Sequence, residues 1–117
     1  MYVIVRGDLS PGYQLVQSNH ALVDFTINFP KTVKTWHEES NYIAGLQVND
    51  EQALLDLCQQ CVSNGIKCSL FREPDIEYQA TALVVEPSDK ARKLCSSLPL
   101  ALKGGEGINK RRYSSTG

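Results

Sequence analysis

A stripe of polar side chains follows the first turn of the chain. Tyr13, Gln17, His20 and Asp24 are spaced i, i+4, i+7 and i+11, so they share one face if this segment is a helix. Histidine exchanges a proton near neutral pH, which makes His20 a candidate general base. The plainer interpretation is a partly buried histidine with a backbone partner. The residues themselves leave both interpretations open.

The segment before this helix is predicted to be a strand and a turn. Residues 2–5 are β-branched or aromatic, and the strand ends at Gly7. Ser10 is suited to cap the helix and Pro11 to occupy its first position. The apolar side of the helix is expected to consist of Leu15, Val16, Leu22, Val23 and Phe25. A helix that starts at the carboxyl end of a strand is where open α/β sheets usually bind ligands.

The rest of the chain alternates helical and extended patterns. The expected elements are a helix over 31–39, a strand over 42–48, a helix ending near 63, strands over 66–71 and 78–85, and a helix over 88–97. Asn49 and Gln52 are expected to form a capping box at the third helix. The core face of that helix is expected to contain Leu54, Leu57, Cys58, Cys61 and Val62. The order β-α-α-β-α-β-β-α predicts an α/β fold of three layers, with a mixed four-stranded sheet between helices.

Length and composition indicate one domain. A chain of 117 residues with 42% hydrophobic residues can bury a core, and its 21% charged residues are typical of globular proteins. Residues 1–102 are predicted to form this domain. From Gly104 the sequence becomes rich in Gly, Ser and basic residues, so 103–117 is predicted to be a flexible basic tail. Neither a membrane-spanning run nor a signal peptide is predicted, which makes a cytoplasmic location the expectation.

Four cysteines and an uneven charge distribution have competing interpretations. Cys58 and Cys61 form C-x-x-C late in a helix, whereas a redox pair should open one, and Cys68 and Cys95 are too far apart to complete a zinc site. Buried free thiols are the preferred interpretation. Residues 88–117 hold seven basic and two acidic side chains. This excess could contact phosphates, or it could be a solvated helix face and tail.

Two motifs resemble the type II peptidyl-tRNA hydrolase family over about residues 2–100. The first is R-x-D-L-x-x-G-x-x-x-x-Q-x-x-H-A, from Arg6 to Ala21. The second is Phe71-x-Glu-Pro-Asp75 followed by Gln79-x-Thr-Ala82, which is similar to the family's aspartate-bearing loop and the strand after it. Glu86-Pro87 resembles the family's glycine-proline before the last helix. The element order expected above is also that of the family.

The resemblance implies hydrolysis of the ester that joins a peptide to tRNA, without a metal or cofactor. Such a reaction needs a positioned water, a base and an oxyanion donor. The implied base is His20, oriented by Asp8 or Asp75, and the implied donors are Gln17 or the N–H groups of the Gly12 turn. Thr81 is implied to bind substrate by resemblance alone. The implied partner is tRNA carrying a peptidyl or acyl group, with a homodimer as a further expectation.

The chain departs from the family at two places. The family usually has two lysines in the first turn, and here Tyr13 and Pro11 stand at those positions. Tyr13 can donate one hydrogen bond in substrate binding but brings no charge. The late loop is shorter by about six residues if Asp75 matches the family's aspartate. The alternative function is therefore a non-catalytic member of the fold that binds RNA, protein or a small ligand.

Overall fold

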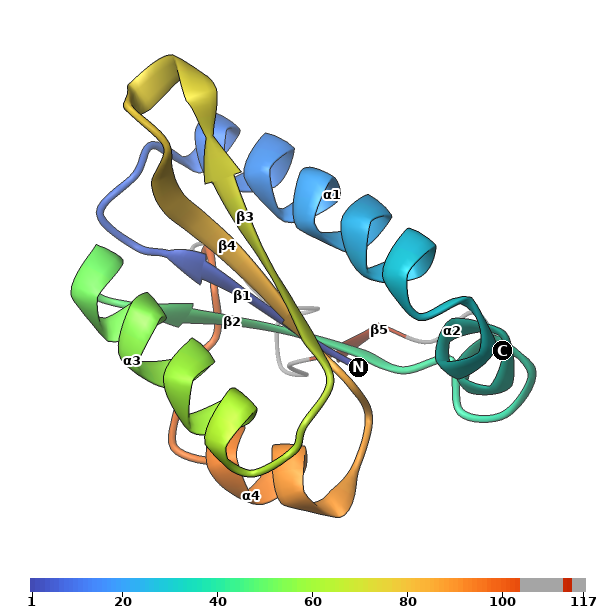
Figure 1. Ribbon diagram of the computed structural model, residues 1–117. Helices are drawn as coiled ribbons and strands as arrows, with labels where there is room; N and C mark the ends of the chain where they lie inside the picture. The colour runs from blue at the N-terminus through green and yellow to red at the C-terminus, as the bar shows by residue number, and fades with distance from the viewer. Residues whose placement is uncertain (104–112, 115–117) are drawn as a thin grey trace.

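The computed structural model describes residues 1–103 and the short segment 113–114. The elements are β1 (Tyr2–Arg6), α1 (Pro11–Asn28), α2 (Pro30–Glu38), β2 (Ile43–Val48), α3 (Glu51–Ser63), β3 (Cys68–Glu73), the 3-10 turn η1 (Pro74–Ile76), β4 (Gln79–Val85), α4 (Asp89–Cys95) and β5 (Tyr113–Ser114). This confirms the predicted order β-α-α-β-α-β-β-α, to which β5 is added (Figure 1). Most of the predicted tail, 103–117, lies outside the described residues.

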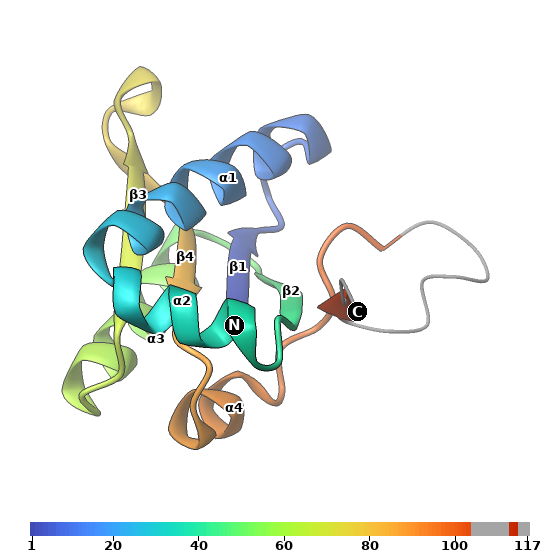
Figure 2. The same cartoon turned by 90° about the vertical axis from the view of Figure 1, so that its right-hand side faces the viewer.

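The strands form one mixed sheet in the order β3-β4-β1-β2-β5 (Figure 2). β1 is parallel to β2 and antiparallel to β4, and β3 is antiparallel to β4. β5 adds two residues to the outer edge of β2. The four longer strands are those that the sequence predicts, and the hairpin of β3 and β4 follows from the short connection between them.

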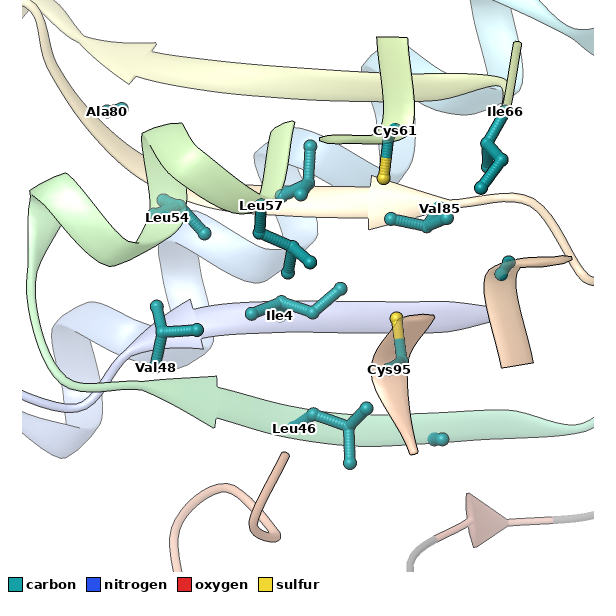
Figure 3. Close-up of a cluster of buried hydrophobic side chains, with 13 residues drawn as sticks. Ile4, Leu46, Val48, Leu54, Leu57, Cys61, Ile66, Ala80, Val85 and Cys95 are labelled. Atoms are coloured by element: carbon teal, nitrogen blue, oxygen red, sulfur yellow. The ribbon is translucent and has the colours of Figure 1, made fainter. Parts of the chain in front are cut away.

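Each face of the sheet buries its own hydrophobic core, because successive side chains of a strand point to opposite faces. In β1, Val3 and Val5 pack with Phe25 of α1, whereas Ile4 packs with Leu54 and Leu57 of α3. Figure 1 shows α1 on one side of the sheet and α3 and α4 on the other. Figure 3 shows the α3 and α4 core, with side chains of both helices directed at β1, β2 and β4. The three-layer prediction is thus confirmed.

The buried face of α1 differs from the prediction. Phe25 is buried as expected, but Leu15, Val16 and Val23 are exposed. The buried positions are Gln14, Gln17, Ala21 and Phe25. The prediction failed because the helix buries two glutamines, whose NH₂ groups donate to the carbonyl of Leu9 and to Glu73, and leaves aliphatic side chains on its outer face.

α3 also corrects two details. Its N-cap is Asp50, whose carboxylate accepts the N–H of Ala53 at 2.9 Å, so the predicted box of Asn49 and Gln52 is wrong. Asp50 is one residue closer to the first turn than Asn49, and its negative charge also interacts favourably with the helix dipole. Val62, predicted to be in the core, is 62% exposed.

The four cysteines are free thiols. Cys61 and Cys95 are buried and visible in the core of Figure 3, while Cys58 and Cys68 are half-buried. Loss of hydration raises the pKa of Cys58 and of Cys95 to about 11. These thiols therefore stay protonated at neutral pH and pack as small apolar groups. Within residues 1–103 and 113–114, no helix has both the length and the apolar composition to cross a membrane.

β4 contains a bulge that decides where the site lies. Phe71 is paired with Ala82 and Arg72 with Ala80, so Thr81 is an extra residue in β4. Without the bulge, Thr81 would share the face of Leu83 and Val85, which pack toward α3. The extra residue instead turns Thr81 toward α1, as bulges beside functional sites often do.

Candidate active site

Two polar clusters lie at the same end of the sheet, around the start of α1 and the tip of the β3 and β4 hairpin. The first joins α1 to the hairpin. The Thr81 hydroxyl donates to Gln17 Oε1 at 2.6 Å, and Gln17 Nε2 donates to Glu73 Oε1 at 2.9 Å. Gln17 and Thr81 are completely buried, whereas Glu73 is half-buried. The carboxylate of Glu73 is therefore the end of this chain of hydrogen bonds that solvent can reach.

His20 lies one turn further along α1. Its imidazole is exposed and stacks on the ring of Phe71, with centroids 4.7 Å apart and planes 15° from parallel. Phe71 and Glu73 are two residues apart in β3, so their side chains share a face, as do Gln17 and His20 on α1. The two cross-element contacts, His20 with Phe71 and Gln17 with Glu73, therefore place His20 and Glu73 on the same surface between α1 and β3, one turn apart along α1.

The second cluster is built on Arg6, the last residue of β1, which is 7% exposed. Its guanidinium donates to both oxygens of Asp8, from Nε at 3.0 Å and from Nη2 at 2.8 Å. Nη1 donates to Gln79 Oε1 at 2.8 Å and to the carbonyl of Ala80 at 3.2 Å. The hydrogen bonds from Arg6 lower the pKa of Asp8, so this carboxylate stays ionised. The cluster fixes the turn between β1 and α1 to the start of β4.

Ala80 shows why the two clusters lie on different faces. Its N–H donates to Glu51 Oε2 at 2.7 Å, and its carbonyl accepts from Arg6. Arg6 follows Val5 by one residue, so it points toward α3, whose first residue is Glu51. Thr81 points toward α1 because of the bulge. The predicted contact of Asp8 with His20 is not formed, since Arg6 holds Asp8 on the other side.

The remaining predicted residues surround the start of α1. Asp75, in η1, is exposed, and among the described residues neither Asp75 nor Asp8 bonds to His20. Tyr13 lies in the field of Glu73 and Asp75, and its pKa is raised by lost hydration and by these two charges, so it remains a hydrogen-bond donor. Gly12 is exposed in the first turn, where helical N–H groups lack acceptors in their own helix.

Three residues of the site were not predicted as functional. Glu73 lies within the late motif, in which the resemblance to the family indicated Asp75 instead. The sequence could have indicated Glu73 by its position in the strand, because Glu73 is two residues from Phe71 and its side chain shares the same face. Asp75 instead comes after Pro74, which ends the strand. Arg6 and Gln79 carried no such signal, because their contact joins residues 73 positions apart.

The described part of the chain holds no group of three or more His, Cys, Asp or Glu side chains arranged to bind a metal ion. The groups available for chemistry at this end of the sheet are an imidazole, a carboxylate, a phenol and the N-terminal turn of a helix. Together they can position and deprotonate water and stabilise an oxyanion, which defines a candidate hydrolytic site.

Comparison with known proteins agrees with this class of site. The family model described as "Peptidyl-tRNA hydrolase PTH2" matches residues 1–100. The chain is 28% identical over 113 residues to a protein named peptidyl-tRNA hydrolase from Methanocaldococcus jannaschii, which covers 86% of this chain and 97% of that one. A protein of the same name from Methanococcus vannielii is 28% identical over 110 residues, covering 84% of this chain and 95% of its own. The chain belongs to the peptidyl-tRNA hydrolase PTH2 family.

Proposed function

We propose that this protein hydrolyses the ester bond of peptidyl-tRNA, or of a related acyl-tRNA, and releases free tRNA and the peptide. The observation that carries the proposal is that His20 shares one face of α1 with Tyr13 and Gln17 and packs on β3 next to the Gln17–Glu73 contact, in a chain of this family. The proposed partner is tRNA carrying a peptidyl or acyl group. The proposed location is the cytoplasm, where translation generates such molecules.

His20 is the proposed base. Water attacks the ester carbonyl carbon, and its proton passes to the imidazole as the new C–O bond forms. When the bond to the ribose breaks, the imidazolium returns that proton to the leaving oxygen. The Tyr13 hydroxyl, on the same face of α1 as His20, is proposed to donate to the oxyanion.

The buried and exposed predicted residues receive different roles. Gln17 and Thr81 cannot touch a substrate directly, since both are fully buried. We assign them the positioning of Glu73. Asp8 holds the turn before α1 through Arg6, Asp75 is exposed on η1, and the hydroxyl of the half-buried Tyr13 can bind the substrate.

Loss of the imidazole is expected to reduce turnover by at least about 100-fold, the usual contribution of a general base. The measurement is release of labelled peptide from an N-blocked aminoacyl-tRNA by wild type and His20→Ala. His37→Ala is the matched control, because His37 is an exposed helical histidine in α2 that bonds to Asn41. Activity that survives in His20→Ala would contradict the proposed base.

The same experiment distinguishes hydrolysis from the alternative function, which is non-catalytic binding. A folded wild type without turnover that still binds the tRNA would favour a non-catalytic member of the fold. The missing lysines supply the reason to consider it, because Tyr13 provides no positive charge near the ester. The retained imidazole and its neighbours favour hydrolysis.

We further propose that two copies of the chain associate through the outer face of α1. Leu15, Val16, Val23 and Ile27 are 49–71% exposed on this face. The patch continues into an apolar groove of about 290 Å³ between α1 and the sheet, lined in part by Leu22 and Ile43. Asp24 is the only acidic residue of α1, and the helix contains no Lys or Arg. An uncharged apolar surface of this kind can face its own copy without like-charge repulsion.

Sedimentation equilibrium tests the association. We expect twice the 13.0 kDa monomer mass for wild type, and the monomer mass for Val23→Glu, which would bury a charge at the centre of the interface. Gln60→Glu adds the same charge on the exposed surface of α3 and should leave the mass unchanged. A monomeric wild type would contradict this interface.

A further inference from the structure

We propose that Glu73 is a catalytic residue that holds the attacking water for His20. This inference rests on the proposed hydrolase function, and it assigns a role to a residue to which the resemblance to the family gave none. The sequence suggested that Asp8 or Asp75 would be the carboxylate partner of the base. The structure engages Asp8 with Arg6 and leaves Asp75 exposed on η1, whereas Glu73 lies on the same face of β3 as Phe71, on which His20 stacks.

The position of Glu73 is fixed from inside the protein. The Thr81 hydroxyl donates to Gln17, which sets the amide orientation of Gln17 and directs its NH₂ group at Glu73 Oε1. Two fully buried side chains are thereby used to hold one half-buried carboxylate. Among the described residues, the other oxygen, Oε2, accepts a long contact of 3.4 Å from the N–H of Asp75 and no other hydrogen bond. Oε2 therefore retains acceptor capacity for a water molecule.

The stack on Phe71 places the base on the same side of β3 as this oxygen. Phe71 and Glu73 are on the same face of β3, and His20 and Gln17 are on the same side of α1. A water between the two elements can donate one hydrogen to Glu73 and the other to His20. Its oxygen lone pair is then directed away from both and toward the substrate.

In the proposed step, His20 moves one proton from the water to the ribose oxygen. The water oxygen bonds to the carbonyl carbon, the proton facing the imidazole moves to His20, and the ester bond to the ribose breaks. The ribose oxygen takes the proton from the imidazolium. Glu73 stays ionised throughout, keeping the water's second hydrogen in place and stabilising the transient imidazolium by its charge.

Glu73→Gln tests this role with little disturbance of the fold, because the new amide oxygen can still accept from Gln17. Its NH₂ group would face the water as a donor and misorient it. We expect kcat to fall about 10- to 100-fold, the cost of losing a positioned reactant. KM should change by no more than about twofold, since the ground-state contacts with tRNA are retained.

Asp75→Asn is the matched control, because it removes the same charge two residues away from an exposed position. Both variants should lower KM for the polyanionic substrate equally through their charge, while only Glu73→Gln loses kcat. The double variant His20→Ala/Glu73→Gln should have the kcat of His20→Ala within about twofold, since both side chains act on one water.

The outcomes are distinct. Unchanged kcat in Glu73→Gln, or an equal loss in Asp75→Asn, would overturn the role of Glu73 while leaving the hydrolase function standing. Independent, multiplicative losses in the double variant would overturn the shared water. A folded wild type without any turnover would overturn the hydrolase function itself, and the role of Glu73 with it.

Discussion

Replacing Arg6 with methionine is expected to lower the free energy of unfolding by about 2–4 kcal/mol. Methionine fills the space of the aliphatic stem but donates no hydrogen bonds. The carbonyl of Ala80 and the amide oxygen of Gln79 would lose their donor at a largely buried position. Asp8 limits the loss, because its side chain is 40% exposed and can be rehydrated. Urea unfolding of wild type and variant measures the difference.

Arg72→Met is the control for this change. Arg72 is exposed and donates to the carbonyl of Tyr78 at 3.2 Å, so its removal should cost less than about 0.5 kcal/mol. An equal loss in both variants would show that the buried hydrogen bonds of Arg6 stabilise the fold no more than the exposed hydrogen bond of Arg72.

The pH dependence of the Arg6 effect has a defined sign. Arg6 lowers the pKa of Asp8 in the folded protein below its ordinary 3.8. The ion pair therefore stabilises the fold fully above pH values near 3.8, and this contribution disappears as the pH falls through the lowered pKa. The difference between wild type and Arg6→Met should be constant near neutrality and shrink in acid. A difference that grows in acid would contradict this account.

Thr81→Val is expected to cost about 1–3 kcal/mol although the two side chains have the same shape. The substitution removes the donor of the 2.6 Å hydrogen bond and leaves the fully buried Gln17 Oε1 without a partner. Glu73 would also lose its fixed neighbour. Kinetic loss should therefore accompany the loss in stability, and thermal unfolding and turnover assays on the same preparations would measure both.

A double-mutant cycle with Gln17→Leu isolates the interaction. Removing both polar groups leaves no unsatisfied polar atom at these two positions, so Thr81→Val/Gln17→Leu should be less destabilised than the sum of the single variants by about 1–2 kcal/mol. Additive losses would indicate that the hydrogen bond contributes nothing beyond packing.

The sequence predicted the elements well because local patterns determine them. The apolar stretches of β1 and β4, the alternation in β3 and the stop at Gly65 each indicate an element without reference to the rest of the chain. Gly65 has a φ of +67°, a conformation that favours glycine and ends α3. The four long strands and the three layers follow from these local signals.

The buried face of α1 could not be predicted in the same way. Hydrophobicity favoured Leu15, Val16 and Val23, whereas the protein buries Gln14 and Gln17. Burying an amide group is unfavourable unless hydrogen-bond partners are present at the buried position. The partners of Gln17 are Glu73 and Thr81, which are 56 and 64 positions away and come together only in the folded sheet. The motifs therefore indicated most of the site residues, whereas the hydrogen bonds between them form only in the folded sheet.

The extra residue in β4 makes the site sensitive to the length of one strand. A deletion of one residue between Gln79 and Ala82 would restore regular pairing with β3 and could leave the sheet intact. The hydroxyl at position 81 would then turn to the α3 side, and the amide of Gln17 would lose its donor. Family members that diverge by single-residue insertions or deletions at this point could thus keep the architecture while losing the geometry of the site. The extra residue at the start of β4 is therefore a feature of the site that overall identity does not report.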